Sequence, residues 1–493
     1  MGIFNMFKRP DSPKPENQSS SAIPNIKYLE YVINKWLDSE ERKEQLLAEK
    51  YYDGHHDILE RKKKVIGADG QQVELTNVIN NKLVDNQYRK LVDQKKNYAL
   101  GKPLTISSSN DKYMRELYKI FTKSVHRQVG TLAQYAVDGG IAWLYPYYDE
   151  FGQFKLATFP SYEICPMWKD KSHTILNGAM RYYSEEIFTD KGGVIKVDYV
   201  DLFTTNGIAH FQHQGGKLIP KENPHSDYLY VNGVGFNWDR IPIIPFKYNS
   251  KEIPLIRAVK QLQDALNQVL SDFQNNMEED PRTSILILKN YDGTNIPEFR
   301  QNLATYGVIK VTTVDGVQGG VDTLRVEVNA ANYQAILMQL KRAIVENGRG
   351  FDAKEERMDG DPNQMNIESM YTDIDLDVNA METEFQAGFE ELKWFIDQYL
   401  IHQGKGDYTE DDVQFIFNRD IFINENAMID NCMKSQGMIS NKTLLSKHPW
   451  VNNVEHELKE IEADKQAELE EMSATLEIQN QHAPEPKNFG GDE

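Results

Sequence analysis

Apolar residues in the first part of the chain recur at three- and four-residue steps, the period of an amphipathic helix. The clearest run lies within 28–64, where Leu29, Ile33 and Trp36 share one face. Similar spacing predicts helices over about 77–100 and 111–138. The chain is therefore expected to begin its folded part with several helices.

The pattern changes between about 141 and 247. Short runs rich in Tyr, Val, Ile and Phe, such as IAWLYPYY and IKVDYVDLF, alternate there with turn residues. Runs of this kind are typical of β-strands joined by tight turns. We expect a mostly antiparallel β region attached to the helices.

A helical pattern returns over about 254–280, between Pro254 and Pro281. Its apolar residues follow a heptad-like seam with Asn276 as a polar member. The narrow apolar stripe predicts that this helix packs against copies of itself. The residues expected at that interface are Val259, Leu262, Leu266, Val269 and Phe273.

The remainder of the chain alternates between insert, helix and loop. A β-like insert covers about 282–328, and a second helix is predicted over 330–347. Glycines and charges break all periodicity over 348–364, and a long helix follows over 365–402. A short strand-like FIFN precedes two further helices, predicted over about 424–435 and 453–478.

Charge and composition argue against some classes of function, above all tight binding of nucleic acid. The chain has 493 residues, with 55 basic and 75 acidic side chains and a net charge of −20. Such a protein repels a phosphate backbone at long range, so any contact with nucleic acid should be local and weak. No apolar run approaches a membrane-spanning length. The two cysteines, Cys165 and Cys432, lie far apart, which favours a reducing, cytosolic compartment of origin.

Sequence motifs for catalysis are absent. No phosphate-binding Gly-x4-Gly-Lys loop, Gly-x-Ser-x-Gly elbow or His-Glu-x-x-His helix occurs. His55 and His56 could bind a metal, but a helix end with ring nitrogens bonded to backbone is favoured. His210 and His213 lie three apart in a predicted strand and should point to opposite faces. We expect a non-enzymatic protein without cofactor or metal.

Two further groups of residues are expected to have structural rather than functional roles. Asp373, Asp375 and Asp377 lie two apart on a predicted helix, where their side chains fan around the axis. They are therefore expected on a solvated face rather than at a metal site. Met370 and Met381, with Met358 and Met365, are expected to fill a core rather than form an adaptable binding surface.

Several stretches, taken in order, resemble the portal proteins of tailed bacteriophages, especially those of long-tailed phages of Gram-positive hosts. They are YYDGHHDIL (51–59), NNKLVDNQYRKLVDQKKNYALGKPL (80–104), DGGIAWLYPYYDEFGQFKLATFPSYEICPMW (138–168), LQDALNQVLSDFQNNMEEDPRTSILILKNYDG (262–293), GGVDTLRVEV (319–328) and MISNKTLLSKHPWVNNVEHELKEIE (438–462). The resemblance covers roughly 30–475, and the order of the stretches is more specific than any one of them.

The resemblance implies an α+β fold, elongated and multi-domain, with a wing, a helical stem, a small β-containing clip and a helical crown. The corresponding ranges are an arm over 1–27, a wing over 28–252, a stem helix over 253–281, a clip over 282–328, a second stem helix over 329–347, a tunnel loop over 348–364, a long helix over 365–403, a crown over 404–478 and a disordered acidic tail over 479–493.

The resemblance also implies a function and partners. It predicts a ring of about twelve copies at one capsid vertex, assembled in the host cytoplasm and carried in the virion. The ring would pass double-stranded DNA, dock the terminase large subunit and later a head-completion or adaptor protein, and contact the major capsid and scaffolding proteins. No membrane contact is implied.

Basic residues near the tunnel loop are candidates for intermittent contact with DNA phosphates in the channel. The candidates are Lys341, Arg342, Arg349, Lys354 and Arg357. Alternatively, they pair within or between subunits with the nearby Asp352, Glu355 and Glu356. Two other functions stay open: a minor capsid or scaffold component that never touches DNA, and, with less support, a phage-encoded nuclease.

Overall fold

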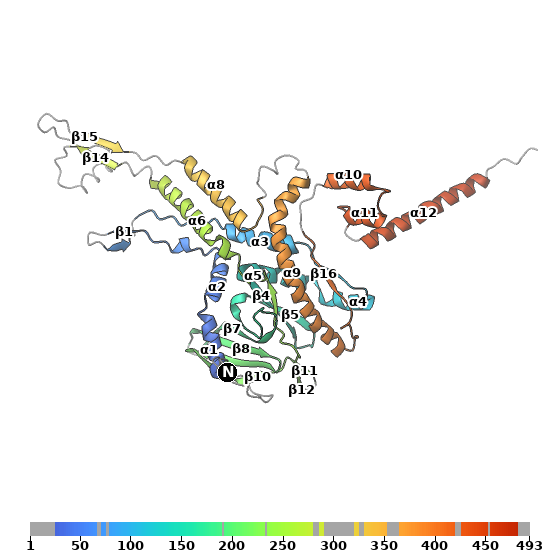
Figure 1. Cartoon of the computed structure of the whole chain (residues 1–493), viewed down its shortest axis with the longest axis horizontal. Coiled ribbons are helices and arrows are strands. Elements are labelled where there is room, and N and C mark those ends of the chain that lie inside the picture. Colours follow the sequence, from blue (N-terminus) through green and yellow to red (C-terminus); the bar gives the residue numbers. More distant parts are fainter. Residues whose placement is uncertain are drawn as a thin grey trace, which may run out of the picture. The chain divides into compact units, whose positions relative to one another are not determined.

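The computed structural model describes residues 25–66, 71–74, 78–189, 192–231, 234–279, 285–289, 320–324, 330–352, 364–419, 425–451 and 454–481. The chain divides into two compact units (Figure 1). The larger unit comprises Met1–Phe351 and Asp373–Asp420, and the smaller unit comprises Asp352–Thr372 and Ile421–Glu493. The predicted arm, the acidic tail after Gln481 and most of the clip and tunnel loop lie outside the described residues.

The larger unit begins with helices, as predicted, but their bounds differ from the predicted ones. They are α1 (Ile26–Leu37), α2 (Glu40–Tyr52), η1 (Asp57–Glu60), α3 (Gln87–Leu100), α4 (Asp111–Ile120) and α5 (Lys123–Gly139). Ser39 separates α1 from α2 because its hydroxyl accepts the N–H of Arg42 and caps the second helix. The helix predicted over 77–100 begins only at Gln87, and the preceding segment is extended.

The predicted antiparallel β region is confirmed and forms two main sheets. A five-stranded sheet has the order β10-β9-β8-β7-β6, and a three-stranded sheet has the order β13-β4-β5. Their strands are β4 (Ile141–Tyr148), β5 (Phe154–Phe159), β6 (Ile164–Trp168), β7 (Leu176–Phe188), β8 (Val194–Thr204), β9 (Gly207–Gln214), β10 (Lys217–Ser226) and β13 (Ile244–Lys247), with η2 (Ser161–Glu163) before β6. Two small hairpins are β1 (Lys64–Ile66) with β2 (Gln72–Glu74) and β11 (Leu229–Val231) with β12 (Val234–Phe236).

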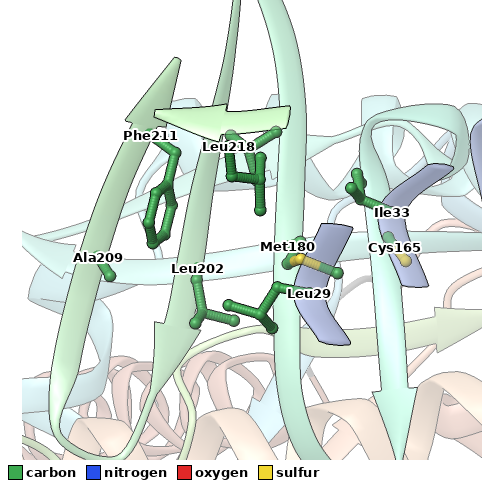
Figure 2. Close-up of a cluster of buried hydrophobic side chains, with 9 residues drawn as sticks. Leu29, Ile33, Cys165, Met180, Leu202, Ala209, Phe211 and Leu218 are labelled. Carbon is green, nitrogen blue, oxygen red and sulfur yellow. The ribbon is translucent and has the colours of Figure 1, made fainter. Parts of the chain in front are cut away.

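Helix α1 covers one face of the five-stranded sheet. Leu29 and Ile33 of α1 are fully buried and lie against Met180 and Leu202 of the sheet (Figure 2). Met180 on β7 pairs directly with Leu202 on β8, so both point to the same face. Burying a Leu or Met side chain contributes about 1.5–3 kcal/mol, and this cluster holds the N-terminal helix on the sheet.

A second core forms where the long helix α9 (Gln364–His402) meets the three-stranded sheet. Phe385 and Phe389 of α9, one turn apart, both contact Phe246 of β13 at ring-centroid distances of 5.0 and 5.3 Å. Gly388 lies between them, and a Cβ there would come within 2.8 Å of the Phe246 ring. The predicted long helix is therefore confirmed, and an absent side chain allows its close approach to the sheet. Met370 and Met381 of α9 are buried, as predicted.

One element of the predicted crown belongs to the larger unit. Strand β16 (Gln414–Ile416) pairs antiparallel with β3 (Thr105–Ser107), which lies in the predicted wing. Its Phe415 is buried against Phe389 of α9. Residues 404–419 therefore belong to the larger unit rather than to the unit of the helices that follow.

The predicted stem helices are present as α6 (Ile256–Glu279) and α8 (Ala330–Asn347), which pack against each other. In the predicted clip, β14 (Ile285–Lys289) and β15 (Gly320–Leu324) form an antiparallel pair. The smaller unit contains α10 (Glu425–Ser435), α11 (Asn441–Lys447) and α12 (Val454–Gln481). The sequence pattern predicted α10 and α12 but not the short α11, which Ser440 caps. Within the described parts of the chain, no helix is long and apolar enough to cross a bilayer.

Candidate functional site

A row of polar side chains on α6 holds the extended segment that precedes α3. Three of these side chains accept a hydrogen bond from a backbone N–H of that segment, and the fourth accepts one from the first turn of α3. The four bonds join Asn275 to Asn81 at 2.7 Å, Ser271 to Leu83 at 2.9 Å, Asn267 to Asp85 at 3.0 Å and Gln263 to Tyr88 at 3.0 Å. We call this arrangement the amide ladder.

The ladder fits because two repeats match in length. Four helical residues rise about 6 Å, and two extended residues advance about 6.6 Å. Asn275, Ser271 and Asn267 therefore meet the alternate N–H groups of residues 81, 83 and 85, and Gln263 meets the N–H of Tyr88 in the first turn of α3. The remaining polar atoms of Asn267 are also satisfied, since its amide donates to the ring of buried His56 at 2.8 Å. Burial lowers the pKa of His56, which favours the neutral ring that this bond requires.

The ladder was missed in the sequence, although a signal was present. Gln263, Asn267, Ser271 and Asn275 recur at four-residue steps, and all four are buried. The prediction for this helix rested on its apolar seam and did not consider its polar row. The ladder is also the reason why the helix predicted from residue 77 begins only at Gln87.

The apolar seam of α6 is largely covered by its own chain. Val259 and Leu266 are fully buried, so they have no surface left for a neighbouring copy. The ring of Phe273 lies 5.0 Å from that of Tyr333 on α8, and Asn276 donates to the Tyr333 hydroxyl at 2.8 Å. The predicted interface is thus corrected at Val259 and Leu266. It stays a prediction for Leu262, Val269 and Phe273, which are partly exposed.

The chain leaves α8 through a tight junction against α3. A Cβ on Gly348 or Gly350 would come within 2.4 or 2.3 Å of the Leu91 side chain, so a larger residue at either position would displace Leu91. Between them Arg349 adopts a left-handed φ of 49°. Gln94 of α3 donates to the carbonyl of Phe351 at 2.9 Å. The start of the predicted tunnel loop is therefore fixed to α3.

A buried ion pair completes this junction. The Nζ of Lys95, a fully buried side chain, lies 2.5 Å from Asp377 of α9 and donates to the Arg349 carbonyl at 3.2 Å. The hydroxyl of Tyr248 donates to the same carboxylate. Burial lowers the pKa of Lys95, and Asp377 opposes this effect. Lys95 of α3 thus contacts both the segment that follows α8 and helix α9.

The three spaced aspartates on α9 are not all on a solvated face, contrary to prediction. Asp373 is exposed, but the Asp377 side chain retains only 14% of its accessible surface. Asp375 accepts a bond from the Tyr98 hydroxyl at 3.0 Å and pairs with Arg419 at 2.9 Å. The prediction was wrong for Asp377, whose partners Lys95 and Tyr248 come from distant parts of the sequence, whereas the Asp375 side chain keeps 43% of its accessible surface.

The described DNA-channel candidates all form ion pairs within the chain. Lys341 pairs with Asp85 at 2.7 Å, Arg342 with Glu346 at 2.9 Å and Arg349 with Asp377 at 3.6 Å. These partners differ from the nearby acids considered in the sequence. Lys354 and Arg357 lie outside the described residues.

The interpretation of a ring nitrogen bonded to backbone is confirmed for one nitrogen of His56, and the opposite faces of His210 and His213 are confirmed. His56 Nε2 lies 3.0 Å from the Tyr51 carbonyl oxygen. His210 contacts Asp201 and Ser226, whereas His213 contacts Asn34 from the other face of the sheet. Over the part of the chain that the structure describes, no group of three or more His, Cys, Asp or Glu side chains is placed to hold a metal ion.

A small polar cavity of about 200 Å³ lies between α2, α5 and η2. Asp138 of α5 lines it, and burial raises the pKa of this carboxyl to about 8. Tyr88 donates its hydroxyl to Asp138 at 2.8 Å, while its own N–H belongs to the amide ladder. The ladder therefore ends beside a buried carboxyl group whose pKa is raised.

Comparisons with known proteins identify the family of this chain. The model of the family described as "Phage portal protein, SPP1 Gp6-like" matches residues 33–471. The portal protein of Bacillus phage SPP1 is 27% identical over 455 residues, covering 91% of this chain and 87% of the relative. The portal protein of Clostridium phage phiCD119 is 29% identical over 446 residues, covering 87% and 95%. The chain belongs to the SPP1-like family of phage portal proteins, a component of the virion.

Proposed function

We propose that copies of this chain form a closed ring of about twelve subunits that conducts double-stranded DNA into the capsid and later out of it. The observation that carries the ring is the exposure of α8. All of α8 is described, and Ile344 is its one buried residue. Ile336 and Met338 remain 45% and 65% exposed. Uncovered apolar side chains on a helix of this length favour contact with a neighbouring copy.

The electrostatics support transit rather than tight binding of DNA. The chain has a net charge of −20, so a channel built from it presents few sites for counterion release. The exposed pairs of Lys341 and Arg342 contribute little to stability, about 0–1 kcal/mol each. Such cations can exchange a carboxylate for a passing phosphate at small cost. We propose that they make these transient contacts, together with Arg349.

The proposed ring also implies which proteins the chain contacts. We propose that the insert between α6 and α8, which includes β14 and β15, docks the terminase large subunit during packaging and the head-completion or adaptor protein afterwards. Other surfaces would meet the major capsid and scaffolding proteins during assembly in the host cytoplasm. In this proposal the chain acts without catalysis or cofactor, and the motor's ATPase resides on the terminase.

Electron microscopy of the purified protein tests the ring. Hollow rings are expected for the unmodified chain, and Ile336→Asp combined with Met338→Asp should give monomers that keep their helical content. Ile175→Asp, at a similarly exposed apolar residue of the larger unit, is the matched control and should assemble. Monomeric unmodified protein at micromolar concentration would contradict the proposal and favour a scaffold role.

A further inference from the structure

The β7–β8 hairpin ends in an apolar tip that its own chain leaves uncovered. We define the tip as residues 184–188 of β7 and 194–198 of β8, beyond the region where α1 covers the sheet. All five tip residues of β7 are exposed, and Phe188 retains 74% of its accessible surface. Phe188 pairs directly across the hairpin with exposed Val194, so the two side chains share a face.

The larger unit also carries an apolar pocket of about 160 Å³, which we call the corner pocket. It lies where β3, α4 and the start of α5 meet. Among its lining residues are Pro103, Leu104, Tyr118, Phe121, Val125 and Val129. An apolar cavity of about 150 Å³ is large enough to take up benzene, so this pocket has room for one aromatic ring.

The charges around the tip and the pocket are complementary. The face of the tip that carries Phe188 also carries Glu186 opposite Lys196 and Ser184 opposite Asp198, so its two carboxylates and one ammonium group leave a net negative charge. Lys123 lines the corner pocket. A phenylalanine with a nearby carboxylate therefore matches an apolar pocket with a nearby ammonium group.

The occupant that fits is a second copy of this chain. The exposure of Phe188 shows that it does not fill the pocket of its own subunit. A cyclic ring is built from heterologous contacts, in which each subunit offers two unlike surfaces. We propose that the β7–β8 tip of one subunit inserts Phe188 into the corner pocket of the next, an inference that rests on the proposed ring.

Cysteine cross-linking tests the contact directly. Val194→Cys beside Phe188 and Thr122→Cys at the pocket rim place thiols on both partners while leaving Phe188 in place. Both native cysteines are buried, and burial raises the pKa of the Cys165 thiol, so background reaction should be low. After mild oxidation of assembled rings, denaturing gels should show a ladder of covalent oligomers. Neither single variant should give one.

A matched pair provides the position control. Val194→Cys with Ile219→Cys, on exposed β10, should not form a ladder. A band at the dimer alone, from Val194→Cys with Thr122→Cys, would indicate an isologous pairing and overturn the head-to-tail contact.

Substitution of the tip tests its contribution to assembly. Phe188→Asp should lower the ring fraction at a fixed protein concentration by roughly tenfold or more in mass photometry. Phe151→Asp is the matched control, since Phe151 is 78% exposed on another turn of the same unit. Lys123→Glu should weaken assembly, and adding Glu186→Lys should restore it, which a purely structural role of Lys123 would not produce.

The outcomes separate this inference from the ring itself. Rings that form without a cross-linked ladder, and that tolerate Phe188→Asp as well as Phe151→Asp, would overturn the tip contact and leave the ring intact. A failure of the unmodified chain to form rings would overturn both.

Discussion

The two predicted stem helices use their surfaces in opposite ways. Helix α6 has its polar row bonded to the 81–88 segment and two of its seam residues fully buried. Helix α8 buries one residue and leaves Ile336 and Met338 exposed. The comparison shows that a heptad-like seam need not mark a surface between subunits. In this chain the ladder and two of the five seam residues attach α6 to its own subunit, whereas α8 leaves Ile336 and Met338 uncovered.

The largest expected effect comes from placing a charge in the covered seam. Leu266→Asp should lower the free energy of unfolding by more than about 4 kcal/mol, because the carboxylate is buried without a partner. Met338→Asp should change it by less than about 0.5 kcal/mol while reducing assembly. Urea unfolding monitored by circular dichroism, together with mass photometry, measures both quantities. If Leu266→Asp folds normally but assembles poorly, the roles of α6 and α8 are the reverse of those described here.

The next largest effect is expected at the junction where the chain leaves α8 and contacts α3. Lys95→Met should cost about 3–5 kcal/mol, because Asp377 is left buried without its main cationic partner. Adding Asp377→Asn should recover part of the loss, since the uncompensated charge is then removed. Arg342→Met, which breaks an exposed pair on α8, is the control and should cost less than about 1 kcal/mol. If Lys95→Met and Arg342→Met lost the same free energy of unfolding, the distinction between the buried Lys95–Asp377 pair and the exposed Arg342–Glu346 pair would be contradicted.

The buried Asp138 makes stability depend on pH. Its folded-state pKa of about 8 lies above the usual carboxyl range, so the folded chain holds a proton that the unfolded chain releases. Stability should therefore fall as pH rises from about 4 to about 8 and level off above that, by a few kcal/mol. Asp138→Asn should flatten this dependence and stabilise the protein at pH 8–9. Unfolding curves at several pH values test the sign, and an unchanged slope would contradict it.

A smaller loss is expected from the ladder itself. Asn267→Leu removes the acceptor of the Asp85 N–H and the donor to His56 Nδ1, at a cost of about 2–3 kcal/mol. Gln268→Leu, one residue further on the exposed side of α6, is the matched control and should be nearly neutral. Thermal unfolding of both variants measures the difference. Equal melting temperatures would show that the ladder follows from the fold rather than stabilising it.

Local pattern explains which parts of this fold could be predicted from the sequence. The second stem helix was predicted at 330–347 and observed at Ala330–Asn347, because its period is uninterrupted. The extended segment before Gln87 could not be predicted, since its hydrogen-bond partners lie about 180 residues away on α6. The burial of Asp377 likewise depends on Lys95 and Tyr248, which no local window contains. The sequence named the candidate cations but not the acidic residues with which they pair.

The smallest effect on folding is expected for the cations themselves. Changing Lys341, Arg342 and Arg349 together to Gln removes pairs that contribute about 0–1 kcal/mol each at the surface. The junction should survive, because Asp377 keeps Lys95 and the Tyr248 hydroxyl as partners. The variant should thus fold and assemble as the unmodified chain does.

The same variant should nevertheless alter DNA passage if these cations line the channel. Each lost phosphate contact lowers the salt dependence of DNA affinity, so packaged DNA should be retained less at low salt and about equally at high salt. Lys341→Arg is the control, because it keeps a positive charge beside Asp85. Packaging and retention assays at two salt concentrations measure the effect. Because folding and assembly are unaffected by design, identical DNA retention at both concentrations would place these residues outside the channel and leave α8 with a role in assembly alone.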